Sequence, residues 1–248
     1  MSVLFVTGTS TGVGKTVATA ALAACALAAN RPVTIVKLVQ TGLPEGAAGD
    51  VAEAGRLSGC RSLVELHRYP DPLAPEAAAR TSGRPFPDLA RLRVAIEELA
   101  ATGDLVLVEG AGGLLVRFDA RGETLADLAA MMAAPVVVVA AAGLGTLNHT
   151  ALTLEALDRR RIAVAGVILG SWTAEPDLAA RSNLADFPAI IGEPLQGALP
   201  EGAAGASREG FRTIAVAGLS PRFGGRFDCR DLDLPPITAP TTEAEDAR

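Results

Sequence analysis

Lysine is almost absent from this sequence. Of its 22 basic residues only two are lysines, Lys15 and Lys37, and the others are all arginines. Arginine serves as well as lysine at most solvated positions, but its planar guanidinium cannot replace a compact ammonium among phosphates or against a small anion. We therefore expect Lys15 and Lys37 to hold positions that require an ammonium; for Lys37, the alternative is a solvated lysine retained by chance.

Cysteine is also scarce, and the three cysteines, Cys25, Cys60 and Cys229, stand far apart. This spacing excludes a cysteine-based metal site, and the odd number suits a reducing compartment better than a disulfide framework. No apolar run reaches the roughly 18 residues, free of charge and glycine, that a membrane span needs. The start of the sequence also lacks the basic region of a signal peptide. We expect a cytoplasmic protein that does not contact a membrane.

Aromatic residues make up only 4% of the chain, although 49% is hydrophobic. A core of alanine, valine and leucine is typical of helices packed closely on a parallel sheet. The net charge is −6, so a surface for nucleic acid is not expected. The length suits one large domain, which we expect over residues 1–225. The prolines and acids of residues 226–248 predict a disordered tail.

Residues 8–16 predict a phosphate-binding loop. They follow the apolar residues 3–6 and precede an alanine-rich segment, which gives the order strand, loop, helix. The glycines let backbone N–H groups turn toward phosphate oxygens, Lys15 adds a charge at the outer phosphates, and the Thr16 hydroxyl suits Mg²⁺. A strict pattern has glycine at position 9, where this chain has threonine. A glycine-rich turn with an unrelated lysine is the alternative.

Polar residues follow the next predicted strand. Residues 33–36 are β-branched and predict a buried strand that ends at Lys37, with Gln40 and Thr41 just beyond it. Ligands of open α/β sheets bind beyond the carboxyl ends of the strands, so this edge is expected to face the phosphate loop. Asp50 begins a further predicted helix, where it could cap the helix or reach Mg²⁺.

A third predicted strand ends in an acid. Residues 105–108 are apolar, and Glu109 follows them directly. An acid at this place is typical of a Walker-B carboxylate, which binds Mg²⁺ directly or through water. A strand-end glutamate without a metal role is the alternative. The glycines behind it, at 110, 112 and 113, would let a substrate or another backbone come close.

The rest of the chain also alternates between strands and helices. Residues 136–142 predict a strand buried on both faces, and residues 143–150 turn into a helix whose free N–H groups could hold a carboxylate. His149 in this turn is expected to be structural. A strand over 164–169 and a short helix over 176–184 follow. The pattern predicts an α/β fold of the P-loop NTPase type, with a mostly parallel central sheet and helices on both faces.

Four motifs together resemble the dethiobiotin synthetase family of biotin synthesis. They are Thr7-Gly8-Thr9 with Val13-Gly14-Lys15-Thr16, Gln40-Thr41-Gly42, Val108-Glu109-Gly110-Ala111-Gly112-Gly113, and Leu144-Gly145-Thr146-Leu147-Asn148-His149. The resemblance covers about residues 1–218. It implies an ATP-dependent ligase that uses Mg²⁺ and takes up 7,8-diaminononanoate, CO₂ and a nucleoside triphosphate. Such an enzyme closes a ureido ring through a carbamic-phosphoric anhydride and releases a nucleoside diphosphate and phosphate.

The resemblance also implies the residues that act. The catalytic residues would be Lys37, Lys15 and Thr11, and the Mg²⁺ ligands would be Thr16, Asp50 and Glu109. The nucleotide would be bound by Gly12, Val13, Gly14, Lys15, Thr16, Val17, Glu109, Gly170, Pro200, Gly202 and Ala203. The substrate would be bound by Lys37, Thr41, Gly112, Gly145, Thr146, Leu147 and Asn148. The last four would come from the partner subunit of a homodimer.

The chain departs from the family at two places. Many members have proline after the strand-end lysine, where this chain has Leu38. Many also have Asn-Asp where this chain has Gly170-Ser171, and the asparagine amide pairs with adenine. Without that amide, the base would be bound only by backbone groups around Gly170 and residues 200–203. Strict preference for ATP is therefore not expected.

Two other classes of protein compete with this interpretation. Partition and cell-division ATPases of the deviant P-loop group carry an additional lysine four residues before the glycine of Gly-Lys-Thr, where this chain has Ser10. The chain also lacks their basic or amphipathic C-terminal helix. An amidotransferase-type synthetase would need a glutaminase domain with a nucleophilic cysteine and a histidine, for which the chain offers neither the length nor a suitable pair.

Overall fold

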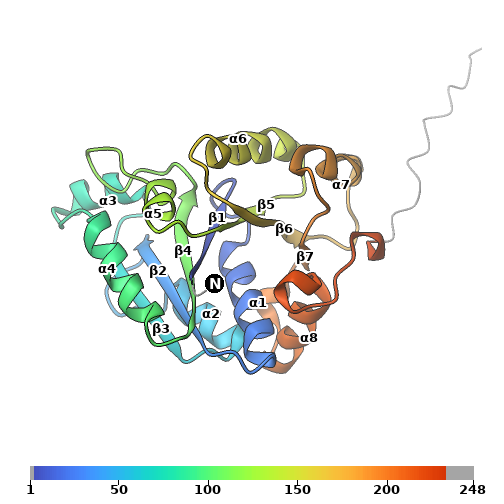
Figure 1. The fold of residues 1–248 in the computed structure, drawn as a ribbon, viewed down its shortest axis with the longest axis horizontal. Coiled ribbons are helices and arrows are strands. Elements are labelled where there is room, and N and C mark those ends of the chain that lie inside the picture. Colours follow the sequence, from blue (N-terminus) through green and yellow to red (C-terminus); the bar gives the residue numbers. More distant parts are fainter. Residues whose placement is uncertain (1–2, 233–248) are drawn as a thin grey trace, which may run out of the picture.

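The computed structural model describes residues 3–232, and within that range seven strands form one sheet in the order β3-β2-β4-β1-β5-β6-β7 (Figure 1). The strands are β1 (Val3–Gly8), β2 (Val33–Thr41), β3 (Ser62–Tyr69), β4 (Leu105–Gly113), β5 (Val136–Ala140), β6 (Val164–Trp172) and β7 (Gly197–Pro200). All six neighbouring pairs are parallel. The predicted α/β fold with a parallel central sheet is confirmed.

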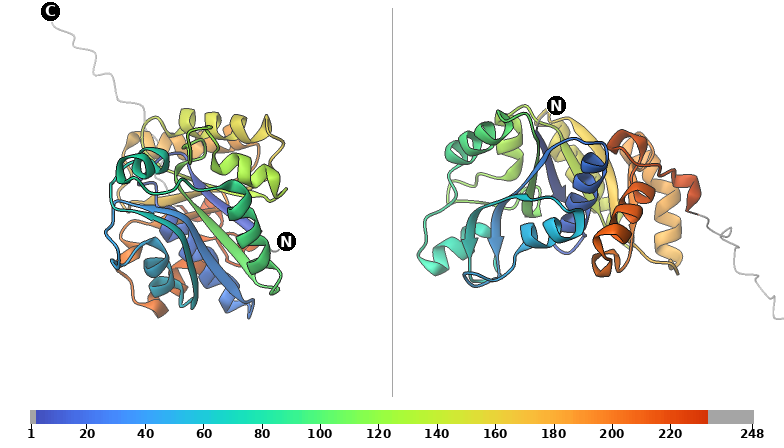
Figure 2. Two further views of the ribbon diagram at one scale, coloured as in Figure 1. Left: turned by 90° about the vertical axis from the view of Figure 1, so that its left-hand side faces the viewer. Right: turned by 90° about the horizontal axis from the view of Figure 1, so that it is seen from below.

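Helices cover both faces of this sheet (Figures 1 and 2). They are α1 (Lys15–Ala28), α2 (Asp50–Ser58), α3 (Pro75–Ser82), α4 (Leu89–Ala100), α5 (Leu125–Met131), α6 (Thr146–Asp158), α7 (Leu178–Ile191) and α8 (Arg208–Gly218). Helices α1, α2 and α8 pack with one face of the strands, and α3 to α7 pack with the other. Across the described residues, no helix combines the length and apolarity needed to cross a bilayer.

The alternation of side chains along the strands decides which way the charged residues point. In β4, Leu105 and Leu107 belong to the core on the α1 side, whereas Val106 and Val108 belong to the opposite core. Since side chains in a strand alternate with a period of two, Glu109 faces the α1 side. Val33 and Ile35 of β2 also belong to that core, so Lys37 faces the same way.

Several elements differ from the sequence prediction: β4 and β6 run on past the predicted strand ends, and β5 ends at Ala140. β2 continues through Thr41 instead of ending at Lys37. The predicted helix over 176–184 is α7, which runs on to Ile191 because Phe187 anchors its second half in the core and Gly192 ends it in a left-handed conformation. β3 was not predicted, because it lies at the sheet edge and its side chains are mostly half-buried.

The folded chain also extends beyond the predicted domain end at residue 225. The N–H of Phe227 donates to the Leu219 carbonyl at 2.8 Å, and the Phe227 ring is buried with the α3-to-α7 core. A short 3₁₀ helix, η3 (Cys229–Asp231), follows. The first part of the predicted tail is therefore ordered against the domain, and residues 233–248 lie outside the described residues.

Gly170 is a position beside the phosphate loop where we expect a side chain to be poorly tolerated. A Cβ atom there would lie 2.0 Å from the Val13 carbonyl oxygen and 3.0 Å from Gly14 Cα. Gly170→Ala should lower the free energy of unfolding by about 2 kcal/mol or more, because the phosphate loop must shift to admit the methyl group. Urea unfolding measures this change.

Gly205→Ala is the matched control, because nothing lies within 4 Å of the added Cβ. We expect this variant to stay within about 0.5 kcal/mol of the wild-type protein. Equal stability of Gly170→Ala and Gly205→Ala would contradict the close packing of β6 against the phosphate loop.

Candidate active site

The loop between β1 and α1 has the backbone of a phosphate cradle. Gly12 and Gly14 have φ values of 76° and 92°, a left-handed region that favours glycine. Gly14 is also the N-cap of α1 and provides no side-chain cap. The N–H groups of the first helical turn are thus left for an anionic ligand, and the helix dipole favours negative charge at the same place.

The glycine offset at the start of the motif has a steric cause. A Cβ atom on Gly8 would lie 2.7 Å from the Ser10 carbonyl oxygen and 3.1 Å from Lys15 Nζ. That carbonyl accepts a hydrogen bond from Lys15 Nζ at 3.0 Å, so the lysine side chain folds back over the loop. In this chain the Ser10 carbonyl and the Lys15 side chain come close to the backbone at Gly8, so position 8 has no room for a side chain. Position 9 is not restricted in this way and carries the threonine.

Lys37 lies at the centre of a buried charge cluster. Its Nζ is 2.5 Å from Asp50 Oδ2, 2.7 Å from Glu109 Oε1 and 3.0 Å from the Gly110 carbonyl oxygen. Lys37 and Glu109 are paired across the neighbouring strands β2 and β4, and their side chains are only 4% and 2% exposed. Glu109 Oε1 also accepts a hydrogen bond from Thr16 Oγ1 at 3.0 Å, which joins the cluster to the phosphate loop.

The two lysines have opposite electrostatic environments. Burial and the nearby Lys37 lower the pKa of Lys15 to about 8, although Glu109 and Asp50 act in the other direction. For Lys37, burial favours the neutral amine, but the adjacent Glu109 and Asp50 outweigh it and raise the pKa above its usual value. Lys37 is therefore an ammonium throughout the physiological range, whereas Lys15 is the more easily deprotonated of the two.

A cavity of about 420 Å³ brings most of the predicted site residues together. The predicted residues that line it are Thr11, Gly12, Gly14, Lys15, Thr16, Val17, Lys37, Thr41, Asp50, Glu109 and Gly112. It lies beyond the carboxyl ends of β1, β2 and β4, where open parallel sheets bind their ligands. Val13 has its side chain in the α1-side core instead.

The donor set in this cavity fits Mg²⁺ bound together with a nucleotide. The predicted ligands Thr16, Asp50 and Glu109 offer a hydroxyl and two carboxylates. Thr16 Oγ1 lies 3.0 Å from Glu109 Oε1, and Asp50 and Glu109 both contact Lys37 Nζ. Mg²⁺ prefers such oxygens and usually takes one or two carboxylates plus phosphate oxygens and water. In the range 3–232, no group of three His, Cys, Asp or Glu side chains could hold a metal alone. Phosphates would have to complete the shell.

The residues predicted to bind the nucleotide base lie outside the 420 Å³ cavity. Gly170 touches the backbone of residues 13 and 14, and Pro200 pairs with Trp172 where β6 and β7 end. Arg56 of α2 donates to the carbonyls of Ala204 and Ala206, which fixes the segment that contains Gly202 and Ala203. Gly170 is therefore close to the loop, and these residues offer a base mainly backbone groups.

The predicted carboxylate site at the start of α6 is separate from the cavity within one chain. Gly145, Thr146, Leu147 and Asn148 are not among the residues that line the 420 Å³ cavity. Thr146 has its donors engaged, since its N–H bonds to the Gly143 carbonyl and its hydroxyl to the Ala141 carbonyl. A second cavity of about 410 Å³ runs from Ser10 and Thr11 to His149 and Leu152 of α6.

Sequence reasoning missed the residue that holds this turn in place. Asn183 of α7 is 8% exposed, and its Nδ2 donates to the carbonyls of Ala142 and Gly143, each at 2.9 Å. The partners lie about 40 residues apart along the chain. No periodic or motif signal connects positions so far apart.

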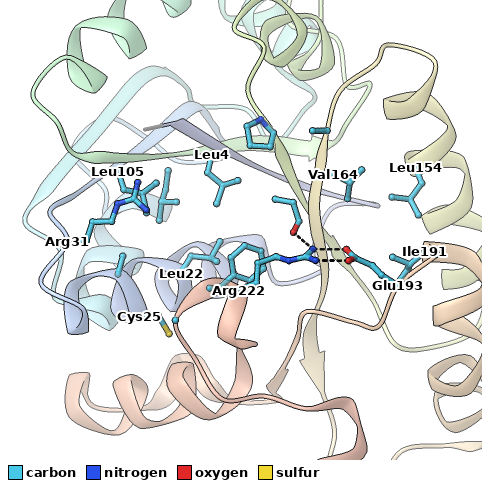
Figure 3. A pocket seen from close by; sticks show the side chains of 18 of the residues that line it. Leu4, Leu22, Cys25, Arg31, Leu105, Leu154, Val164, Ile191, Glu193 and Arg222 are labelled. Atoms are coloured by element: carbon cyan, nitrogen blue, oxygen red, sulfur yellow. Dashed lines mark hydrogen bonds and ion pairs between the residues drawn. The ribbon is translucent and has the colours of Figure 1, made fainter. Parts of the chain in front are cut away.

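A further cavity lies at the opposite end of the sheet (Figure 3). It measures about 1040 Å³ and is walled by apolar residues such as Leu4, Leu105 and Val164 at the amino ends of β1, β4 and β6. Its charged residues include Arg222, which is paired with Glu193 through two contacts of 2.7 Å. None of the predicted site residues lines this cavity, so we assign the chemistry to the smaller one.

Known proteins resemble this chain over most of its length. Residues 2–204 match the model of the AAA domain family. A protein of Saccharopolyspora erythraea named ATP-dependent dethiobiotin synthetase BioD is 57% identical over 227 residues, which cover 92% of this chain and 99% of that protein. The protein of the same name from Streptomyces avermitilis is 55% identical over 228 residues, 92% of this chain and 96% of that protein.

Solved structures show a wider likeness of fold. The MinC:MinD cell division complex of Aquifex aeolicus contains a chain with a TM-score of 0.55 at 14% identity, covering 96% of this chain and 99% of that chain. A ParA family ATPase of Chlorobium tepidum TLS has a TM-score of 0.53 at 15% identity, and the match covers 90% of this chain and 93% of that chain. At such low identity these two likenesses show the P-loop fold alone. The high identity over nearly the whole length decides the family: the chain belongs to the ATP-dependent dethiobiotin synthetases.

Proposed function

We propose that the protein is a dethiobiotin synthetase of the cytoplasm, an ATP-dependent ligase that joins 7,8-diaminononanoate and CO₂ into the ureido ring of dethiobiotin. The observation that carries this proposal is the Lys37 ammonium, buried between Glu109 and Asp50 beside a phosphate loop. Partition and cell-division ATPases carry their additional lysine within the loop, whereas here the second lysine comes from a neighbouring strand. A ligase that joins two anions needs such a second cation.

The proposed reaction has three steps. One amine of the substrate attacks CO₂, forms a C–N bond and loses a proton, which leaves a carbamate. A carbamate oxygen then attacks the γ-phosphorus, and the bond to the diphosphate oxygen breaks. Finally, the second amine attacks the carbonyl carbon, inorganic phosphate leaves with the carbamate oxygen, and the amine loses its proton.

The two lysines support the phosphoryl transfer from different sides. Carbamate and triphosphate repel each other, so positioning and charge neutralisation make up most of the barrier. Lys15 reaches across the loop toward the β- and γ-phosphates, and Lys37 enters from β2 to meet the carbamate and the transferring group. The hydroxyls of Thr11 and Thr41 line the same cavity and would contact the reacting groups.

Mg²⁺ held by Thr16, Asp50 and Glu109 would neutralise charge on the β- and γ-phosphates. Lys37 already contacts both carboxylates, so these residues align the ammonium and the phosphates in one place. The Gly112 backbone adds a close surface for the substrate, because its φ of 66° turns the chain at the cavity wall.

A homodimer would complete the substrate site. The turn at residues 145–148 stands apart from the cavity in a single chain, and Leu144 beside it is 93% exposed. Such an apolar side chain at a helix start favours a protein interface. We propose that Gly145, Leu147 and Asn148 of one protomer bind the diamine's carboxylate above the cavity of its partner, with Thr146 stabilising the turn.

A partition or cell-division ATPase is the competing function, and no feature of the site favours it. Those proteins carry a lysine where this chain has Ser10, whose carbonyl oxygen is instead an acceptor for Lys15. The likeness to MinD and ParA is one of fold.

Product formation by wild-type protein and by Lys37→Arg tests the proposed function. Wild-type protein with the diamine, bicarbonate and MgATP should yield dethiobiotin, identified by its mass. Lys37→Arg should keep the fold and bind ATP but lose about 10²-fold or more in kcat. The single nitrogen of the Lys37 ammonium has three acceptors within 3.0 Å. A planar guanidinium spreads its donors over three nitrogens, so it cannot bond to all three acceptors from the same position.

ATP affinity and thermal unfolding serve as the controls for this experiment. Both should stay near the wild-type values in Lys37→Arg. Near-normal kcat in that variant would remove the role assigned to Lys37, and absence of dethiobiotin from wild-type protein would remove the function.

Hybrid dimers test the shared site. Lys15→Ala lacks phosphate binding, and Asn148→Phe blocks the partner's carboxylate site, so each should be inactive alone. In a mixture, half of the dimers would be hybrids with one intact site, which gives about one quarter of wild-type activity. Differently tagged chains show whether subunits have exchanged; exchange without recovered activity would contradict a site shared between protomers.

Nucleotide selectivity tests the missing base contact. Because Gly170 has no side chain and the surrounding backbone offers few directed donors, CTP, GTP and UTP should compete usefully with ATP. Binding constants for the four triphosphates with Mg²⁺ measure this. A preference for ATP above about 100-fold, or ~2.7 kcal/mol, would show that another group recognises adenine.

A further inference from the structure

Helix α2 begins at Asp50 without a cap of its own. The preceding residue, Gly49, is the N-cap and has no side chain to accept a hydrogen bond. The N–H of Asp50 donates instead to Gln40 Oε1 at 2.8 Å. Gln40 belongs to β2, so the start of the helix that carries the Asp50 carboxylate is held by the strand that carries Lys37.

The packing around Gly49 excludes a local cap. A Cβ atom there would lie 2.7 Å from Gln40 Oε1, 2.9 Å from Arg68 Nη2 and 3.0 Å from Glu65 Oε2. A serine, threonine or aspartate at this position would therefore displace the three groups that surround it. The glycine and the remote glutamine cap depend on each other.

Gln40 is itself fixed in orientation. It is only 5% exposed, and its Nε2 donates to the Thr41 carbonyl oxygen at 3.2 Å. With the amide nitrogen bound on one side, the amide oxygen is directed toward Asp50. Gln40 also lines the 420 Å³ cavity together with Thr41 and Asp50.

The loop between Thr41 and Asp50 is held at its middle as well. Arg68 of β3 donates from Nη1 to the carbonyls of Pro44 and Ala47 at 2.9 and 2.8 Å. Its other nitrogens make two contacts with Glu65, at 2.5 and 2.7 Å. The last turn of the loop is therefore constrained between Arg68 and Gln40.

We propose that Gln40 is a positioning residue of the active site: by capping α2 from β2, it fixes the Asp50 carboxylate against the Lys37 ammonium. The positioning of Asp50 by Gln40 follows from the hydrogen bonds alone, whereas the effect on Mg²⁺ use rests on the proposed function. Loss of the cap should let the start of α2 move, carry Asp50 away from Lys37 and weaken the site for Mg²⁺ with nucleotide.

The scarcity of lysine makes this testable without turnover. Protein labelled with ¹³C at lysine Cε should show two Cε–Hε signals, from Lys15 and Lys37. Asp50→Asn, which removes the carboxylate charge, identifies the Lys37 signal and the direction of its displacement. In Gln40→Met, which keeps the length but loses both amide hydrogen bonds, the Lys37 signal should move in that same direction.

Gln40→Asn provides a second variant that keeps a polar amide but is one methylene too short to reach the Asp50 N–H. The Lys37 signal should move in it as well. In both variants the Mg²⁺ concentration for half-maximal activity should rise by about 3- to 30-fold, the range that corresponds to the loss of one helix cap. At saturating Mg²⁺, kcat should recover more fully than it does in Lys37→Arg.

Gln196→Met is the matched control. Gln196 is also buried, its Nε2 donates to the Pro194 carbonyl and its Oε1 accepts from Ser220, but it lies before β7. This variant should lose stability without moving the Lys37 signal or the Mg²⁺ requirement. An unmoved Lys37 signal in folded Gln40→Met and Gln40→Asn would overturn the positioning role. The proposed function fails separately, if wild-type protein makes no dethiobiotin.

Discussion

Burial of an ammonium group is tolerated only where acceptors replace its water, and the carboxyl edge of this sheet is organised around that requirement for Lys37. Glu109 must stand directly across from it in the neighbouring strand, and Asp50 must begin a helix within reach. Two carboxylates and one carbonyl satisfy the three donors of the ammonium. Under the proposed function, the charge that this arrangement stabilises is also the charge that a carbamate and a phosphoryl group need.

The phosphate loop and the Lys37 cluster form one electrostatic unit. Thr16 joins them through its bond to Glu109, and the nearby Lys37 contributes to the lowered pKa of Lys15. An anionic ligand between the two lysines would relieve their mutual repulsion, so the protein without substrate is already shaped for negative charge. The Gly170 backbone packs on the loop so closely that no room is left for a side chain at this position.

The sequence predicts those parts of the site that local patterns encode. The order strand, Gly-Lys-Thr and helix locates Lys15 and Thr16, and the apolar runs that end at Lys37 and at Glu109 place both residues at the carboxyl edge of the sheet. Contacts between distant segments leave no such pattern. The Gln40 cap, the Asn183 bonds to the α6 turn and the edge strand β3 depend on tertiary packing, as does the burial of Phe227 beyond the predicted domain end.

Oxygen isotope transfer tests most directly that this site joins a carbamate to a phosphoryl group. Wild-type protein is mixed with the diamine, MgATP and ¹⁸O-labelled CO₂ for times shorter than the exchange of CO₂ oxygen with water. We predict that the phosphate released carries one ¹⁸O atom and that the ureido carbonyl of dethiobiotin carries the other. Unlabelled phosphate formed together with dethiobiotin would contradict the account, because the carbamate oxygen would then never have bonded to phosphorus.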